Sequence, residues 1–599
     1  MFPRNLEQSR TLAIDLIERR WKLVVLLVWL GFAIWFVVEK WSAIQAFGLG
    51  DTDDNLRIMQ VRGLLHGQGW YDLRQYRLNP PWGANIHWSR LVDLPIAGLI
   101  LGLRPFLGGA GAERWAVAIA PMLPYLLVLF SMALTVRRLV DKRAYPLVFL
   151  PLFWAGSTNG MFMPERIDHH GWQLAFLALG MAAVADPKRT RGGLLLGLAT
   201  ALSLAIGLEM LIYLAIFGAA MVLFWVADRG EGERLRAYAV ALSGGTAFAF
   251  LVFASNANWG PVCDALSPVW LSDALLGGAL LFLLARLAPE RWPVRLALAA
   301  AAGLTIAGFH ALMWPHCLSR LEGVSPEVEQ LWLSHVREAR PVYRHGWRTA
   351  LSIVSIPVTG AIGWMLLAWF KRQDRELVRR IIAAAAPALV AALLLLWQTR
   401  TGPAAQMLGS IGAAALVWLL FPRIWNAKAI PLAVAGTALL VVAGAGAALP
   451  FTLKFFPDDK PSKRDLAIRR ANFLCNSMWG LGPVARQPKG MVFTFIDLGP
   501  RLIAVTPHNA VGGPYHRNGQ QIADVMNAFR GSADQAHAII RKYRSDYLLT
   551  CPDSSTTTIF RAETPTGFYA QLHKGEVPSW LQPIDLGPDS PFRMYRVTG

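Results

Sequence analysis

Charged side chains are scarce in this chain: they make up 16% of its 599 residues, whereas 54% are apolar. Soluble proteins average roughly a quarter charged residues, and this composition excludes intrinsic disorder and a coiled coil. Cysteine is also rare, and four cysteines in so long a chain exclude a small secreted module held by disulfides. Glycine-rich phosphate loops and Rossmann patterns are absent, so we expect no nucleotide-sugar site. A polytopic membrane protein remains, in agreement with a mean hydropathy of +0.37.

Acidic residues are fewer than basic ones, 39 against 58, which gives a net charge of +19. An excess of positive charge can indicate nucleic-acid binding. Most of the Lys and Arg residues, however, lie in short loops between apolar runs, where positive charge orients membrane segments. We therefore expect no nucleic-acid partner. We also expect no cleavable signal peptide, because the N-terminus is polar and amphipathic for about twenty residues.

About thirteen apolar runs predict membrane-spanning helices, since roughly 20 residues cross the hydrocarbon core. The run at 92–108 is short and broken by Pro95, so we expect it to be an interfacial or re-entrant element. The predicted spans are 23–41, 115–134, 144–159, 171–185, 192–208, 210–227, 237–254, 269–286, 295–313, 347–370, 381–398, 402–421 and 429–449.

The basic residues set the predicted orientation, because cytoplasmic loops carry an excess of Lys and Arg. With a cytoplasmic N-terminus, the basic loops fall on one side, and the opposite short loop 255–268 has no Lys or Arg. This topology places 42–91, 314–346 and 451–599 outside the cytoplasm. We expect a bacterial inner membrane protein. The basic groups are Arg19–Lys22, Arg137–Arg143, Lys188–Arg191, Arg229–Arg236, Arg286–Arg295, Lys371–Arg380 and Arg423–Lys428.

The predicted domain boundary lies at 450, where the last apolar run ends. Residues 1–450 form the transmembrane domain, and 451–599 form an extracytoplasmic soluble α/β domain. Short runs in this tail have β-like composition, and one stretch has a helical pattern. The expected strands are Met491–Asp497, Arg501–Val505 and Tyr547–Thr550, and the expected helix is Ser532–Tyr543.

All four cysteines fall on the extracytoplasmic side of this topology. Cys263 and Cys317 lie in outer loops, and Cys475 and Cys551 lie in the tail. An even number on the oxidising side indicates two disulfides. We expect Cys263 to pair with Cys317 and Cys475 with Cys551; buried free thiols are the alternative.

Three carboxylates follow the first predicted span within four residues, at Asp51, Asp53 and Asp54. Because like charges repel, this cluster indicates either a bound cation or an acid–base role. The alternative is an ordinary helix start, with Asp as the N-cap and acids in the first turn.

A second cluster, Asp168-His169-His170, ends the loop before a predicted span on the same face. Hard carboxylate oxygens with one imidazole suit Mn²⁺ or Mg²⁺ better than structural zinc. We therefore predict a metal site formed by Asp51, Asp168 and His170. The alternative is a pair of interfacial histidines.

Two further candidates lie on the same side. Glu338 belongs to the outer loop 314–346, where the alternative is an interfacial helix that pairs it with Arg337 or Arg340. Arg400, at the outer end of a predicted span, either snorkels or binds an anion such as a lipid phosphate. Glu209, at another outer helix end, is a candidate of the same kind.

The order of these motifs resembles the catalytic subunit of oligosaccharyltransferase, a GT-C glycosyltransferase. Asp168-His169-His170 matches the D-H-H motif of that family, and Arg400 sits where a family arginine contacts the donor pyrophosphate. Two more motifs align with this chain. Asp51, Asn55 and Arg57 correspond to D-P-Y-F-N-Y-R, and Ser334, Val336, Glu338 and Pro341 to S-V-S-E-H-Q-P.

One family motif is missing: W-W-D, which grips the acceptor sequon, has no counterpart in the tail. The donor half of the machinery therefore matches and the acceptor half differs, so asparagine-sequon glycosylation is not implied. The tail offers His508 and His516 in its place, and the membrane domain offers Arg57 and Glu209, as acceptor or supporting residues.

The resemblance implies a GT-C-like helical membrane fold and a glycosyltransferase with a polyprenyl-phosphate or polyprenyl-pyrophosphate donor. It implies that the metal neutralises the leaving phosphate, that Arg400 holds this phosphate, and that Asp51 or Asp54 acts on the acceptor. Glu338 would close over the site. The acceptor is an envelope lipid, polysaccharide or protein. The alternative function is a transporter or flippase of lipid-linked sugars, whose charges lie near the bilayer midplane.

Overall fold

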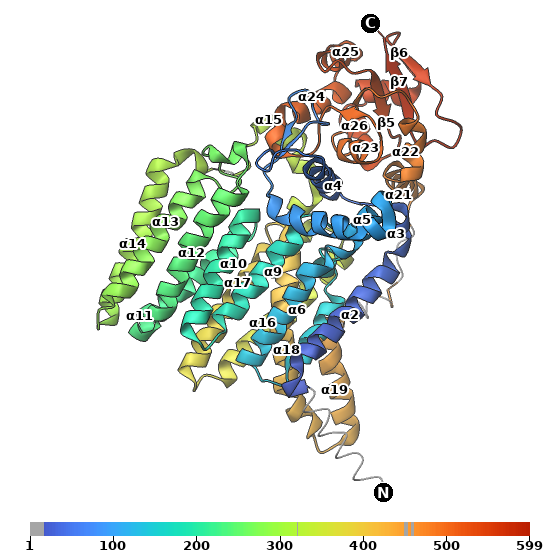
Figure 1. Ribbon diagram of the computed structural model, residues 1–599. Helices are drawn as coiled ribbons and strands as arrows, with labels where there is room; N and C mark the ends of the chain where they lie inside the picture. The colour runs from blue at the N-terminus through green and yellow to red at the C-terminus, as the bar shows by residue number, and fades with distance from the viewer. Residues whose placement is uncertain (1–16, 320, 448–452, 454, 457–460, 599) are drawn as a thin grey trace.

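The computed structural model describes residues 17–319, 321–447, 453, 455–456 and 461–598. A bundle of long helices carries a mixed α/β region, formed mainly by the C-terminal part of the chain, at one end (Figure 1). We call this end of the bundle the capped end. The first 16 residues and the predicted boundary at 450 lie outside the described residues.

The chain is a helical polytopic membrane protein. Eight helical segments of the described chain are long and apolar enough to cross a membrane. They are α2 (Trp21–Glu39), α5 with α6 (Arg90–Ile119 and Met122–Leu139), α12 (Gly232–Phe253) with the preceding turn η2 (Arg229–Glu231), α13 (Pro268–Leu287), α14 (Trp292–Met313), α16 (Trp347–Phe370), α17 (Arg375–Leu394) and α18 (Gly402–Trp425) with the preceding turn η8 (Thr399–Thr401).

The five other predicted spans fall on helices outside this set of eight. The run at 192–208 corresponds to α10, and the remaining four correspond to apolar helices below the length needed to cross unaided. All five segments, α10 included, are η1 (Tyr145–Val148) with α7 (Phe149–Trp154), α9 (His170–Val184), α10 (Arg189–Ile206), α11 (Leu211–Ala227) and α19 (Ile430–Gly444). A short helix, α8 (Gly156–Asn159), follows α7.

Close helix packing in the bundle depends on small residues. A methyl group added to Gly363 of α16 would lie 1.8 Å from the carbonyl oxygen of Gly412 in α18. The same holds one turn away, where a methyl group on Gly360 would lie 2.3 Å from the oxygen of Gly409. Small residues let backbones approach and gain van der Waals contact where lipid gives no hydrophobic driving force.

The interfacial element predicted at 92–108 is part of a longer helix, α5, which bends at Gly108 (φ 68°). In Figure 1, α5 runs across the capped end instead of along the bundle. The predicted span 115–134 is wrong in its start, because α5 ends at Ile119 and α6 begins only at Met122. Pro121 is the N-cap of α6, and proline cannot continue the hydrogen bonding of a preceding helix.

Two long connections lie at the capped end. The first holds α3 (Trp41–Ala46), α4 (Thr52–Leu65) and an antiparallel hairpin of β1 (Arg74–Gln75) and β2 (Ala84–Asn85). The second holds one short helix among 3-10 turns. These are η4 (Pro315–Cys317), α15 (Pro326–Leu331), η5 (Leu333–His335), η6 (Arg337–Ala339) and η7 (Val342–Arg344). A further turn, η3 (Asn256–Trp259), lies between α12 and α13.

The C-terminal region contains a five-stranded sheet in the order β4-β3-β5-β7-β6. β3 pairs in parallel with β4 and β5, whereas β7 is antiparallel to β5 and β6. The strands are β3 (Met491–Phe493), β4 (Asn509–Ala510), β5 (Tyr547–Thr550), β6 (Leu581–Ile584) and β7 (Arg593–Val597). The helices are α21 (Lys463–Cys475), α22 (Met478–Ala485), α23 (Gly499–Val505), α24 (Gly519–Arg530), α25 (Ala533–Lys542), α26 (Ser555–Glu563) and α27 (Phe568–Lys574), with the turn η9 (His516–Asn518) before α24.

Two of the three predicted strands exist, since Tyr547–Thr550 is β5 and Met491–Asp497 contains the shorter β3. The predicted helix Ser532–Tyr543 is α25. The third predicted strand, Arg501–Val505, is wrong, because these residues belong to α23. Their run is buried on every side from Arg501 to Ala504, so it lacks the alternation that distinguishes a half-buried strand from a buried helix.

The hydrophobic core of the C-terminal region is not confined to the tail. Leu56 of α4 and Ala116 of α5 lie in the same buried cluster as Phe493 of β3 and Phe529 of α24. Arg77, between the two strands of the hairpin, donates hydrogen bonds to the carbonyl oxygens of Ile503 and Thr506, both at 2.7 Å. The first connection is therefore clamped between the bundle and the C-terminal region.

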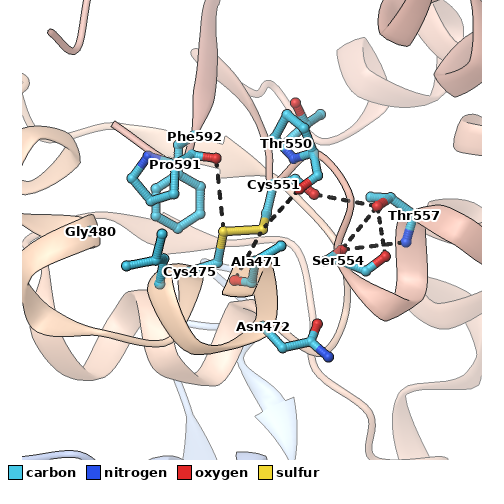
Figure 2. The surroundings of a disulfide bond; sticks show 12 residues. Ala471, Asn472, Cys475, Gly480, Thr550, Cys551, Ser554, Thr557, Pro591 and Phe592 are labelled. Atoms are coloured by element: carbon cyan, nitrogen blue, oxygen red, sulfur yellow. Dashed lines mark hydrogen bonds between the residues drawn. A yellow bond between two sulfur atoms is a disulfide. The ribbon is translucent and has the colours of Figure 1, made fainter. Parts of the chain in front are cut away.

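Both disulfides expected from the sequence are present. Cys263–Cys317 joins the α12–α13 connection to the turn after α14. Cys475–Cys551 joins the end of α21 to the segment after β5, beside Pro591 and Phe592 (Figure 2). No free cysteine remains.

Candidate active site

The acidic segment after α3 begins α4. Asp51 is the N-cap, with extended backbone (φ −113°, ψ 152°), and its Oδ1 accepts a hydrogen bond from the backbone N–H of Asp53 at 3.1 Å. Asp53 and Asp54 occupy the first turn, where the helix dipole favours negative charge. The helix-cap interpretation is therefore correct, but it uses only one of the two Asp51 carboxylate oxygens.

The second Asp51 oxygen belongs to a cluster of three carboxylates around Arg166. Arg166 Nη1 lies 2.5 Å from Asp51 Oδ2 and 3.3 Å from Asp54 Oδ2, and Nη2 lies 2.7 Å from Asp168 Oδ2. The guanidinium thus supplies the positive charge that the repelling acids require. Arg166 was not among the predicted site residues.

The turn that carries Arg166 is fixed by Glu165, which adopts a left-handed conformation (φ 73°). Its carboxylate accepts a hydrogen bond from Gly48 N at 2.8 Å, and its own N–H donates to Val117 O at 2.9 Å. These contacts tie the segment before α9 to the residues just before α4. The two acidic motifs, far apart in sequence, therefore face each other.

Asp168 organises the other half of the cluster. Its N–H donates to Asp54 Oδ1 at 3.0 Å, and its Oδ2 lies 2.9 Å from His170 Nδ1. The backbone N–H of His170 also bonds to Asp168 Oδ1 at 3.0 Å. With Nδ1 engaged, the imidazole of His170 has its orientation set and directs Nε2 away from Asp168.

The carboxyl groups of the cluster differ in acidity. Burial and the neighbouring Asp51 carboxylate raise the pKa of Asp53 to about 7, and burial raises the pKa of Asp54 well above its usual value. Burial alone would also raise the pKa of Asp168, but Arg166 and His170 hold it well below the usual range. Carboxyl groups whose pKa values differ in this way can take different roles, one as a proton acceptor and another as a fixed anion.

A third group adjoins the cluster. His169 Nε2 lies 2.9 Å from Glu209 Oε1, and the Gln173 amide donates to the other Glu209 oxygen. Ligand atoms of His169, His170 and Glu209 lie within 4.8 Å of one another, so this trio could hold a metal ion. Glu209, predicted only as a supporting residue, is thus brought to the site.

Arg57 adjoins the site through its contact with Trp88. It is fully buried, lies 2.9 Å from Asp93 and stacks 4.2 Å from the centre of the Trp88 ring. Trp88 in turn contacts His169 and Tyr515, with ring centres 5.7 Å apart in both pairs. Arg57 therefore contacts the aromatic side of the site, and among the described residues it forms no ion pair with Asp51, Asp54 or Asp168.

The C-terminal region reaches the site through Tyr515 and its two successors. The Tyr515 hydroxyl donates to Thr52 O at 3.0 Å, directly beside Asp51. His516 Nε2 lies 2.6 Å from Asp264 Oδ2, and Arg517 binds both oxygens of Asp264 at 2.7 and 2.6 Å. Burial opposes ionisation here, but hydrogen bonds from His516 and Arg517 hold the pKa of Asp264 well below its usual range.

Three predicted residues lie elsewhere. Glu338 and Arg400 are paired with each other at 3.5 Å and are 63% and 37% exposed. In the described part of the chain, neither has a hydrogen bond or ion pair with Asp51, Asp54 or Asp168. His508 is fully buried in the C-terminal region, where its Nδ1 accepts from Gly490 N and its Nε2 meets Val484 O, so it packs within this region.

The predicted metal ligands fit a hard divalent cation by their chemistry, with oxygens from Asp51 and Asp168 and a nitrogen from His170. Arg166 lies between the two carboxylates, so a cation bound there requires this side chain to move aside. This predicted trio is not among the groups of the described chain whose ligand atoms all lie within 4.8 Å of one another; besides His169, His170 and Glu209, two other trios are. One is His87, Asp264 and His516; the other is His316 with the disulfide-bonded Cys263 and Cys317, whose sulfurs are already used.

Some residues of the site escaped sequence reasoning. Arg166 stands two positions before Asp168 in a segment already singled out, so a search for a counter-ion beside clustered acids would have found it. Asp264 directly follows Cys263, in a loop that stood out in the sequence by its cysteine and by its lack of Lys and Arg. Nothing in the sequence indicated that Tyr515 would reach Thr52, because this contact depends on the packing of distant segments.

The fold has counterparts among solved structures. Residues covering 90% of this chain superpose on 70% of the apo oligosaccharyltransferase of Archaeoglobus fulgidus, with a TM-score of 0.68 and 15% identity. A complex of the archaeal oligosaccharyltransferase AglB from Archaeoglobus fulgidus with an inhibitory peptide and a dolichol-phosphate gives a TM-score of 0.65 at 15% identity, over 89% of this chain and 69% of the other. Its complex with Zn and sulfate gives 0.60 at 14% identity, over 95% and 73%. The chain therefore has a GT-C-like fold.

Sequence comparisons find no counterpart. No protein-family model matches the chain, and no curated protein matches it. The similarity is one of fold across most of the chain.

Proposed function

We propose that this protein is a glycosyltransferase that moves a sugar or oligosaccharide from a polyprenyl-phosphate or polyprenyl-pyrophosphate donor to an envelope acceptor. The observation that carries the proposal is the convergence of Asp51, Asp54 and Asp168 on Arg166 at the capped end. This cluster lies in a chain whose fold is similar to an oligosaccharyltransferase over nine-tenths of its length. The dolichol-phosphate bound to that relative supports the donor class.

In the proposed reaction a bond forms between the sugar's anomeric carbon and the acceptor nucleophile, and the bond from this carbon to the phosphate oxygen breaks. The nucleophile's proton passes to Asp51 or Asp54, which act as base. Burial raises the pKa of Asp54 well above its usual value, so the ionised form of this carboxyl is a stronger base toward the nucleophile's proton. Arg166 keeps the carboxylates together before the substrate arrives.

The donor phosphate is assigned to Arg400, which forms charge-assisted hydrogen bonds to phosphate oxygens. Its exposed contact with Glu338 is weak and easily exchanged for a phosphate. Glu338, on the connection 314–346, then closes over the bound donor.

Metal assistance is part of the proposal, with Asp51, Asp168 and His170 as ligands. Bound there, Mn²⁺ or Mg²⁺ supplies positive charge that stabilises the leaving phosphate. The Zn in the complex of the archaeal oligosaccharyltransferase supports metal binding in this fold.

The acceptor side is assigned to the junction with the C-terminal region, where Tyr515 and His516 approach α4. The acceptor is an envelope lipid, polysaccharide or protein. We propose that the capped end faces away from the cytoplasm in a bacterial inner membrane, with a cytoplasmic N-terminus, as the basic loops predict.

A deletion strain tests the function while the acceptor is still unidentified. Mass spectrometry of envelope lipids, polysaccharides and proteins should show the loss of one class of glycan, with accumulation of its polyprenyl-linked donor. The wild-type gene and the Glu290→Gln variant should restore the glycan, since Glu290 is an 89% exposed residue between α13 and α14. Asp168→Asn should not. An unchanged set of glycans in the deletion strain would refute the proposal.

The same strain separates a transferase from a transporter of lipid-linked sugars. If the chain moved the donor across the bilayer, the accumulated donor would remain on the cytoplasmic side and resist a glycan-cleaving enzyme added to intact spheroplasts. For a transferase, the accumulated donor should be cleaved, because it is already on the outer side.

A further inference from the structure

α21 lies where the C-terminal region meets the capped end. Its C-cap residue, Asn476, accepts a hydrogen bond from Arg501 Nε at 2.9 Å, and another nitrogen of the same guanidinium donates to Phe47 O at 3.0 Å. Phe47 is the C-cap of α3, which follows the membrane helix α2. One arginine thus joins the end of α21 to the end of the short helix that follows the first membrane span. Figure 1 shows α21 on the side of the C-terminal region that faces the bundle.

Phe456, which precedes α21 in the chain, also contacts a membrane helix. Phe456 packs edge-on against Trp347, the first residue of membrane helix α16, with ring centres 6.1 Å apart. Seven residues later α21 begins, with a capping box formed by Ser462 and Asp465. Phe456 before α21 and Asn476 after it are therefore both held by contacts at the capped end.

One face of α21 packs on the C-terminal region, and it carries Ala471 and the disulfide-bonded Cys475 (Figure 2). The opposite face bears Leu466 and Phe473, seven positions apart and hence on one side of the helix. Leu466 is 52% exposed and Phe473 is 75% exposed. Immediately after the helix, Met478 and Trp479 are 47% and 60% exposed.

Positive charge surrounds these apolar side chains. Arg469 and Arg470 lie between Leu466 and Phe473 on the same face, and Lys463 and Arg464 occupy the first turn. Within the described residues no carboxylate forms a salt bridge with Arg469 or Arg470. Asp465 is the only acidic residue of α21, and its carboxylate is used by Ser462.

We propose that α21 is an interfacial membrane helix, which lies on the leaflet at the capped end of the same bilayer that the bundle crosses. Leu466 and Phe473 enter the boundary between headgroups and acyl chains, and Arg469 and Arg470 bind lipid phosphates. A helix with large apolar residues on one face flanked by Lys and Arg is typical of such surface binding. Trp479 adds an aromatic residue of the kind enriched at membrane interfaces. This contact gives the C-terminal region a second attachment to the membrane and favours leaflets rich in anionic lipid.

The test places a nitroxide spin label on the proposed face of the full-length protein in lipid nanodiscs. Because all four native cysteines are in disulfides, one introduced cysteine is labelled alone. Leu466→Cys and Phe473→Cys report on α21. Ala538→Cys is the matched control, since it is an exposed residue on helix α25, which Figure 1 places far from the bundle. The measured quantity is the accessibility of each label to oxygen, which enriches in the bilayer, relative to a water-soluble nickel chelate.

We expect this ratio to be several-fold higher at 466 and 473 than at 538 in nanodiscs of phosphatidylcholine with phosphatidylglycerol. We expect it to fall in phosphatidylcholine alone, and to fall likewise when Arg469→Gln and Arg470→Gln are added to Leu466→Cys. A ratio at 466 and 473 equal to that at 538 in both lipids would overturn the proposal, because the face would then be in water. Spin–spin coupling between labels on different molecules would also overturn it, because a second copy of the chain would then cover the face.

Discussion

The guanidinium of Arg166 and the carboxylate of Asp51 lie 2.5 Å apart, although helices α4 to α8 lie between them in the chain. Asp51 caps α4 with one oxygen and meets Arg166 with the other. This division explains how a local helix signal and a functional cluster share one residue. It also means that the acids are neutralised by the protein itself before any substrate or cation binds.

Replacing Arg166 tests whether its positive charge stabilises the three neighbouring carboxylates. We expect Arg166→Gln to lower stability by roughly 3 kcal/mol, because it leaves three clustered carboxylates without their counter-charge. We also expect Mn²⁺ or Mg²⁺ to restore much of this loss, since a divalent cation can take the place of the guanidinium. Thermal unfolding of the purified protein with and without the metal measures both effects.

The matched control for this experiment is Arg229→Gln, which removes an exposed arginine paired with Glu290 at 3.4 Å. Its unfolding midpoint should change little, with or without metal. If Arg166→Gln were as stable as the wild type, or if metal stabilised both variants equally, the role given to Arg166 would be wrong.

The junction between the bundle and the C-terminal region should depend on Asp264. Asp264→Asn leaves Arg517 buried without its bidentate partner, and we expect a loss of about 3–5 kcal/mol at pH 7. Because the pKa of Asp264 is held below its usual value of about 3.9, its contribution is present above that pH and is lost as the pH falls through the lower, folded-state pKa. The difference in unfolding midpoint between wild type and variant should therefore shrink below about pH 4.

Asp264 also positions His516 and, through it, Tyr515 beside Thr52. We expect Asp264→Asn to raise the KM for the acceptor more than it lowers kcat, because Tyr515 approaches the site from the acceptor side. Asp585→Asn, an exposed change in the C-terminal region, serves as the control. Equal loss of kcat and no change in KM would indicate a purely structural effect.

The helix contact between α16 and α18 should tolerate no larger residue at Gly363. A Val side chain there would collide with the backbone of Gly412, and we expect destabilisation of about 1–3 kcal/mol or more. The control is Gly303→Ala in α14, whose added methyl group meets no atom within 4 Å. Size-exclusion chromatography and thermal unfolding in detergent measure the effect, and a fully stable Gly363→Val variant would contradict the packing described.

Sequence reasoning found the parts of this molecule that follow from local pattern. The helical membrane architecture, both disulfides and strand β5 follow from apolar runs, cysteine placement and residue type. Arg501–Val505 was misassigned because a short apolar run buried on all sides has no period that separates strand from helix.

The remaining features depend on distant contacts. The sequence predicted that Asp51, Asp168 and His170 lie on the same face of the membrane. The position of Arg166 among the carboxylates could not be predicted, because it follows from the left-handed turn at Glu165 and its hydrogen bonds to Gly48 and Val117. The sequence also did not predict the hydrophobic core that α4 and α5 share with the C-terminal region. The predicted domain boundary at the last apolar run assumes that the parts on either side of it pack separately.

The most direct test of the central claim is the turnover of polyprenyl-linked sugars by the purified protein. Lipid-linked sugars extracted from the native membrane, together with total envelope acceptors, are supplied to the protein in nanodiscs, and transfer is followed by mass spectrometry. The account predicts transfer by the wild type and by Glu290→Gln, and a decrease on the order of 10²–10³ in rate for Asp168→Asn, the usual size of losing one electrostatic group at a reacting centre. Transfer by Asp168→Asn at the wild-type rate, or no transfer by the wild type with any acceptor fraction, would contradict it.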